Sequence, residues 1–99
     1  MSRSDAGSLS NIEVTVVSIT GKCSFGHKVG DKIYFDGKKI RGDICLHGLQ
    51  VILPTIIALQ YGADFPWATH ESEGDAVTDA CPDAHNLVVY RLKRTKTPV

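Results

Sequence analysis

Three cysteines and one histidine are the residues of this chain that could carry chemistry together. Cys23 and His27 are separated by three residues in the glycine-rich stretch GKCSFGHKVGD, so a thiolate and an imidazole can reach a common point. Cys45 and Cys81 each stand near the expected end of a secondary-structure element. Thiolates and imidazoles are ligands that suit zinc and iron in proteins. If the four side chains converge, they form a Cys3His metal site, for which we predict zinc or iron as the ion.

The same residues allow two other interpretations. Cys45 falls in the first turn of a predicted helix, where the partial positive charge of the helix N-terminus stabilises a thiolate. It could therefore act as a redox or nucleophilic thiol, with His27 as the base and Cys23 or Cys81 as the resolving thiol. The cysteines could also be simple core residues, because free cysteine is among the most buried residue types. Spacing alone leaves open whether the chain is a metal-binding module or an enzyme.

An aromatic string after the predicted helix gives a second candidate site. Tyr61, Phe65 and Trp67 cluster around Gly62 and Pro66. Their rings are expected to pack over the end of the helix, either to close the core or to line a ligand pocket. In the pocket case the chain is a small-molecule or protein-binding module, and its cysteines are merely buried.

The helix that must position Cys45 is expected after Gly42. Asp43 is placed to cap its start, and Pro54 should kink or split it before it ends near Gly62. The apolar run VILPTIIAL covers roughly half of the ~20 residues needed to cross a bilayer, so we expect a core helix and no membrane association. Its apolar residues recur at helical spacing, at Cys45, Leu49, Ile52, Leu53 and Ile56.

Strands are expected on both sides of this helix. The stretch NIEVTVVSIT, from residue 11, alternates apolar and polar residues. A short strand at 33–35 is followed by an Asp-Gly turn signal. The stretch LVVYRLKR is predicted as the last strand, with Leu87 and Val89 on its apolar face. Residues between the aromatic string and Cys81 are acidic and are expected to be irregular. The residues predicted to share the buried face of the first strand are Ile12, Val14 and Val16.

This order of elements predicts an α+β fold, in which a small antiparallel sheet of three to four strands packs against one Pro-bent helix. The 99 residues fit one domain, which we place at 11–94, after a disordered arm at 1–10 and before a tail at 95–99.

Composition narrows the class of protein. Eleven basic and eleven acidic residues give no net charge, so the overall field that would attract nucleic acid is missing. Three cysteines cannot all pair within one chain, and we interpret them as reduced thiols of a cytoplasmic protein. The first ten residues resemble neither a signal nor a transit peptide. The expected partner is an unidentified small molecule or protein, and a homo-oligomer is left open.

The ordered strings GKCSFGHKVGD, DICLHGL, ALQYGADFPW and ACPD, followed by LVVYRL, resemble a small prokaryotic family of uncharacterised repeat proteins. The resemblance covers residues 12–94 and implies that the three thiols and His27 belong to one recurring set, with no activity attached. One departure is visible at Leu46, where the family often has proline or a small residue. The positions of this sequence that match the family pattern are Cys23, His27, Gly30, Asp31, Cys45, Tyr61, Gly62, Phe65, Pro66, Trp67, Cys81, Pro82 and Asp83.

Overall fold

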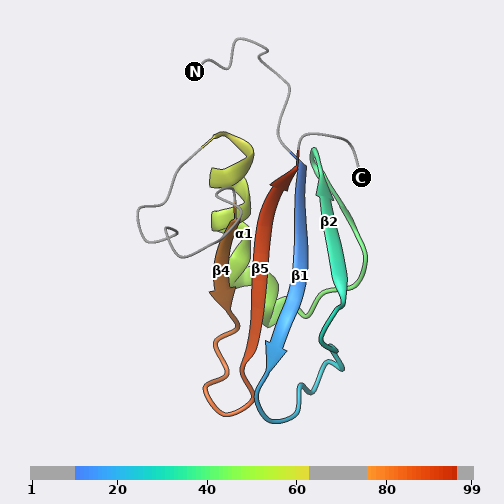
Figure 1. Ribbon diagram of the computed structural model, residues 1–99, viewed down its shortest axis with the longest axis vertical. Coiled ribbons are helices and arrows are strands. Elements are labelled where there is room, and N and C mark those ends of the chain that lie inside the picture. Colours follow the sequence, from blue (N-terminus) through green and yellow to red (C-terminus); the bar gives the residue numbers. More distant parts are fainter. Residues whose placement is uncertain (1–10, 63–75, 96–99) are drawn as a thin grey trace.

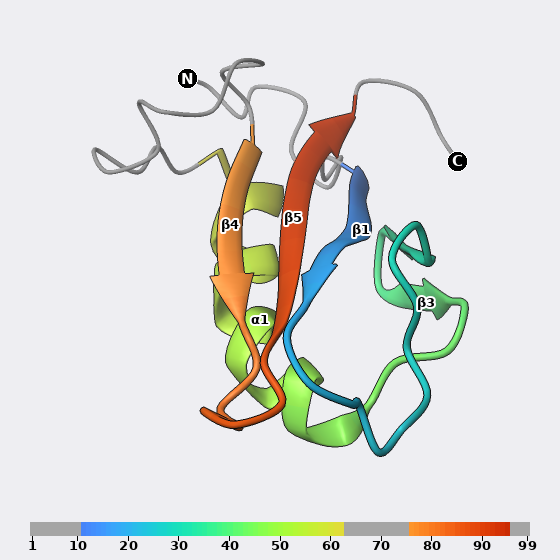
Figure 2. The same cartoon turned by 60° about the horizontal axis from the view of Figure 1, so that its bottom comes forward.

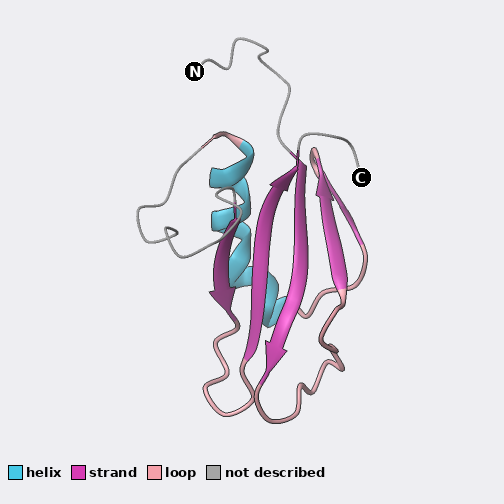
Figure 3. Cartoon of the chain, viewed as in Figure 1, coloured by secondary structure: helices cyan, strands magenta, loops and turns pink. Residues whose placement is uncertain are grey.

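The computed structural model describes residues 11–62 and 76–95, which form one helix and one sheet (Figures 1 and 3). The arm at 1–10, Phe65, Trp67 and the last residues of the tail lie outside the described residues. Within the described ranges no helix is both long and apolar enough to span a bilayer. In chain order the elements are β1 (Asn11–Ile19), β2 (Lys32–Asp36), β3 (Lys39–Arg41), α1 (Leu46–Gln60), β4 (Ala76–Ala80) and β5 (Val88–Thr95).

The five strands form a single sheet in the order β3-β2-β1-β5-β4, and each neighbouring pair is antiparallel. Helix α1 lies on one face of this sheet and contacts β1, β4 and β5 (Figure 2). The predicted α+β fold is therefore confirmed. The sheet has five strands rather than three to four, because the Asp-Gly turn leads into β3 and because β4 forms where an irregular stretch was expected.

The core lies between the sheet and the helix. Ile12, Val14 and Val16 of β1 are fully buried, which confirms the predicted face of this strand. The predicted face of β5 is wrong by one residue, because Val88, Tyr90 and Leu92 point inward instead of Leu87 and Val89. Cross-strand pairing fixes this choice, since Leu92 pairs with Val14, and Tyr90 pairs with Val16. The remaining buried apolar residues include Ile33, Phe35, Ile52, Ile56, Leu59 and Val77.

Helix α1 begins two positions later than its expected cap suggested. The N-cap is Cys45, whereas Asp43 is exposed and lies outside the helix. Pro54 does not split the helix, which continues to Gln60. At the other end, the Leu59 carbonyl accepts a hydrogen bond from the Gly62 amide at 3.1 Å and a second one from the guanidinium of Arg94 on β5 at 2.8 Å.

The strand directions bring the three cysteines to one end of the molecule. In an antiparallel sheet of this order, β1, β3 and β4 run the same way, because β2 and β5 lie between them and run in the opposite direction. Each of these three strands is followed closely by one cysteine: Cys23 after β1, Cys45 after β3 and Cys81 after β4. Helix α1 starts at the same end, and Figure 1 shows the start of α1 and the last residues of β1 and β4 toward the bottom of the sheet.

Candidate thiol site

Cys23, Cys45 and Cys81 line one pocket of about 300 Å³. All three are free thiols and are half-buried. They come from three segments that are far apart in sequence: the loop after β1, the residue that precedes α1 and the loop after β4. The convergence expected from their positions at the ends of elements is thus present for the three thiols. The polar residues Ser24, His47, Gln50, Asp83 and Asn86 also line this pocket.

Cys45 is held at the start of the helix through its backbone. Its carbonyl accepts a hydrogen bond from the Leu49 amide at 2.9 Å, as the N-cap carbonyl of a helix does. Its own amide donates to Nε2 of His27 at 3.4 Å. No side chain caps this terminus, and no acidic residue stands in its first turn. The Cys45 thiol therefore belongs to the N-cap residue of a helix whose first turn holds no carboxylate.

His27 serves as the support for Cys45 and does not line the pocket. Its side chain is buried, and its Nδ1 lies 3.3 Å from Oδ2 of Asp31. Because Nε2 accepts from the Cys45 amide, the neutral ring carries its proton on Nδ1 and donates it to Asp31. Hydrogen bonds from the Lys28 amide and then from His27 lower the pKa of Asp31 below its usual 3.8. Both ring nitrogens of His27 are engaged in this structure, and its role as a fourth metal ligand stays a prediction.

The Cys81 sulfur is fixed by backbone groups of its own loop. The Val88 amide donates a hydrogen bond to Sγ at 3.2 Å, and Sγ lies 3.7 Å from the Asn86 carbonyl, to which the thiol can donate. The Cys81 amide in turn donates to the Val88 carbonyl at 2.9 Å. Two backbone groups of the loop therefore fix the position of the Cys81 sulfur at the pocket.

Asp83 and Asn86 join the Cys81 loop to the Cys23 loop. Oδ1 of Asp83 accepts hydrogen bonds from the His85 amide at 3.0 Å and the Asn86 amide at 3.1 Å, and these bonds lower the pKa of Asp83. Oδ1 of Asn86 accepts from the Lys22 amide at 2.9 Å. The adjacent Gly21 has a φ of 78°, and a Cβ there would lie 2.5 Å from Oδ1 of Asn86. The two loops therefore approach each other too closely for any residue but glycine at this point.

Tyr90 is the site residue that the sequence did not reveal. Its side chain lines the same pocket and is fully buried, yet among the described residues its hydroxyl has no hydrogen-bond partner. Burial raises the pKa of Tyr90 well above its usual value of 10.0, and the three neighbouring cysteines raise it further. The hydroxyl therefore stays protonated and available as a donor. A tyrosine within a strand carries no sequence signal for this role, which follows only from the cross-strand register.

The pocket is not a closed metal cage as it stands. Among residues 11–62 and 76–95, no group of three or more histidine, cysteine or acidic side chains is arranged so that it could hold a metal ion. Holding an ion would therefore require a change in the side-chain torsions of the cysteines. A cysteine has one side-chain torsion, and a change of rotamer moves its sulfur by about 3 Å. The donor set itself fits a soft ion, because each of the three cysteines that line the pocket can become a thiolate.

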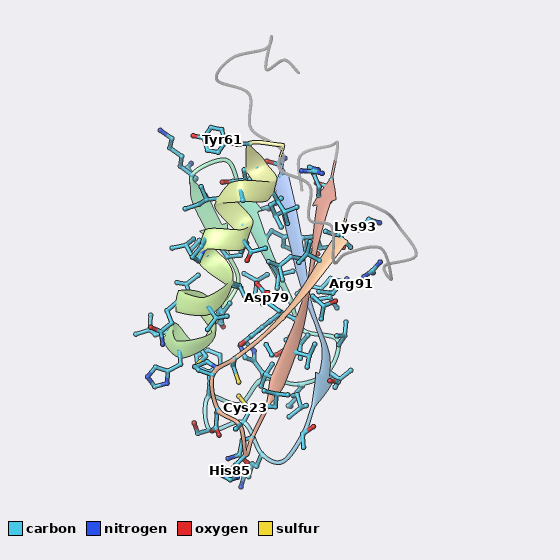
Figure 4. The ribbon with its side chains drawn as sticks, turned by 90° about the vertical axis from the view of Figure 1, so that its left-hand side faces the viewer. Cys23, Tyr61, Asp79, His85, Arg91 and Lys93 are labelled. Carbon is cyan, nitrogen blue, oxygen red and sulfur yellow. The ribbon has the colours of Figure 1, made fainter. Side chains whose placement is uncertain are left out.

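The aromatic candidates lie elsewhere. Tyr61 follows the last residue of α1 and is found at the opposite end of the helix from Cys23 (Figure 4). It borders a second pocket of about 270 Å³ between the helix and the β2-β3 hairpin, with Phe35, Ile40 and Ile57. Phe65 and Trp67 lie outside the described residues, so their predicted packing remains a prediction. The structure thus separates Tyr61 from the thiol site by the length of α1.

Comparison with known proteins gives no match: no family model, no curated protein and no solved structure is significantly similar to this chain. Any function must therefore be argued from the thiol site itself.

Proposed function

We propose that this chain is a small metal-binding module, in which Cys23, Cys45 and Cys81 together hold a soft ion such as zinc or iron. The observation that carries the proposal is the convergence of three free thiols from three distant segments on one pocket of about 300 Å³. Burying three cysteines for packing alone does not require them to face a shared polar-rimmed cavity. Three thiolates leave a fourth coordination position for water or a ligand, as at zinc sites that remain open.

The architecture around the thiols supports this role. His27 and Asp31 position Cys45, while Asp83 and Asn86 hold the Cys81 loop against the Cys23 loop. Supports of this kind orient ligands and are part of most metal sites. A reducing, cytoplasmic environment would keep the thiols available.

A thiol-based redox or nucleophilic function is the second candidate, and the position of Cys45 favours it. Cys45 caps α1 without a side-chain hydrogen bond, and no acidic residue stands in the first turn of the helix. In such a reaction two of the three thiols would form a disulfide, giving up two protons and two electrons to an oxidant such as a peroxide. The chain would then be an enzyme or redox partner and would need no metal.

Zinc titration of variants in which one cysteine is replaced by serine tests the proposal. Structural zinc sites bind with about 10–16 kcal/mol from four ligands, so the loss of one thiolate should cost about 3 kcal/mol, or roughly 100-fold in affinity. Cys23→Ser, Cys45→Ser and Cys81→Ser should each weaken zinc binding by this order. Ser24→Ala, which alters the same pocket without touching a thiol, serves as the matched control and should bind zinc normally.

Alkylation of the native protein separates the two candidates. A metal-bound thiolate is protected, so a chelator should accelerate alkylation of all three cysteines in the metal-loaded protein. If the unmodified chain binds no zinc, and Cys45 alone alkylates rapidly whether or not chelator is present, the metal proposal is wrong and the redox function takes its place.

A further inference from the structure

The hydroxyl of Tyr90 is a buried polar group that has no hydrogen-bond partner among the residues that the structure describes. Tyr90 lies on β5, between β1 and β4, and none of its surface is exposed. Buried hydroxyls are almost always hydrogen-bonded, so an unpartnered one calls for a specific reason. The ring also packs closely against α1 at Gly48, since a Cβ at this glycine would overlap the hydroxyl and lie 2.8 Å from Cζ. Glycine in the first turn of the helix therefore makes room for this group.

Two kinds of acceptor stand near the hydroxyl. The first is the set of three cysteines that line the same pocket as Tyr90. The second is Asp79, which pairs with Tyr90 across β4 and β5 and so projects from the same face of the sheet. Oδ2 of Asp79 is also buried without a partner among the described residues, but Asp79 does not line the pocket.

The cysteines accept a hydrogen bond from Tyr90 well only when they are ionised. A neutral thiol is a weak hydrogen-bond acceptor. A metal-bound cysteine is a thiolate, and hydrogen bonds to charged acceptors are roughly twice as strong as neutral ones. A tyrosine hydroxyl is protonated at neutral pH, so it can donate such a bond.

We propose that Tyr90 is a positioning residue, which donates its hydroxyl hydrogen to one of the thiolates that hold the metal ion in the three-cysteine pocket. The bond offsets part of the negative charge that accumulates when three thiolates gather, and it fixes the orientation of the sulfur that accepts it. This inference rests on the metal-binding function proposed above. It adds a residue whose contribution appears only when the ion is bound.

The substitution Tyr90→Phe removes the hydroxyl and keeps the ring. Zinc affinity, measured by competition with a chromophoric chelator under reducing conditions, should fall by about 10- to 100-fold, as it does when supporting groups of metal ligands are removed. Urea unfolding of the metal-free variant should show equal or greater stability, because the lost hydroxyl has no partner among the described residues. Tyr34→Phe on β2 is the matched control, since Tyr34 stacks with Arg41 on a strand away from the pocket. It should leave zinc affinity unchanged.

These two readouts distinguish a ligand-supporting hydroxyl from a structural one. If Tyr90→Phe binds zinc as tightly as the unmodified chain does, the inference is wrong while the metal-binding function stands. If Tyr90→Phe and Asp79→Asn both lower the stability of the metal-free chain and neither changes zinc affinity, Asp79 is the partner and the inference is again wrong. If the unmodified chain binds no zinc, the proposed function and this inference fail together.

Discussion

The contact between Gly48 and Tyr90 allows a prediction whose sign opposes ordinary helix propensity. Gly48 is buried in the first turn of α1. Replacing a helical glycine with alanine normally stabilises a protein by about 1 kcal/mol, because glycine loses more backbone entropy on folding. Here the new methyl group would overlap the Tyr90 hydroxyl and lie 2.8 Å from Cζ and 3.1 Å from Cε2. Overpacking of this kind costs about 1–3 kcal/mol.

The Tyr90 ring cannot move aside easily, because it is fully buried on a strand that pairs on both sides. We therefore take the upper end of the overpacking cost, about 3 kcal/mol, and subtract the gain in propensity. Gly48→Ala should lower the free energy of unfolding by about 2 kcal/mol, which corresponds to a fall in melting temperature of about 8–16 °C for a domain of this size. Urea and thermal unfolding followed by circular dichroism measure both quantities.

A double-mutant cycle isolates the cause of this loss. Leucine at position 90 lacks the atoms that the alanine methyl would strike, so Gly48→Ala should become stabilising by up to about 1 kcal/mol in a Tyr90→Leu background. If Gly48→Ala instead raises the stability of the otherwise unmodified chain by about 1 kcal/mol, helix propensity alone governs the position. Tyr90 would then not pack against Gly48 as closely as the structure shows, and its hydroxyl would not be fixed in the pocket.

Two further predictions concern groups outside the pocket. Arg94→Met keeps the apolar stem but removes the hydrogen bond to the Leu59 carbonyl, so the free energy of unfolding from urea titrations should fall by about 1 kcal/mol; an unchanged value would show that this bond does not stabilise the helix end. Asp31 has a lowered pKa, so its contribution to stability is present above its unfolded pKa of 3.8 and is lost as the pH falls through its lower folded value. Unfolding measured from pH 7 to pH 2 should therefore show a shallower acid loss in Asp31→Asn than in the unmodified chain, and equal slopes would contradict this assignment.

The sequence was sufficient for the elements with a clear period and insufficient for the rest. In β1, apolar residues alternate with Glu13 and Thr15, so its buried face could be predicted. In β5, Leu87, Val88 and Val89 are consecutive apolar residues, and no alternation distinguishes the two faces there. Only pairing with β1 selects Val88 for the core. The edge strand β4 is short and weakly apolar, and it becomes a strand by pairing with β5.

The candidate site could likewise be predicted only in part. The positions of the cysteines at the ends of elements indicated that they could meet, and the strand order brings the three thiols to one pocket. The hydrogen bonds of His27 could not be predicted from the sequence. One joins its ring to the Cys45 amide across the glycine-rich loop, and the other depends on the rotamer that faces Asp31. The role of Tyr90 depends equally on tertiary packing against Gly48.

X-ray absorption spectroscopy of the zinc-loaded, reduced protein, prepared without a metal-affinity tag, tests the central claim most directly, because it counts the sulfur atoms bound to the ion. We expect one zinc per chain with three sulfur ligands at about 2.3 Å and one lighter atom in the remaining position. Cys81→Ser should reduce the count to two. A spectrum with no sulfur ligand, or with only one, would contradict the proposal that Cys23, Cys45 and Cys81 bind a metal ion together.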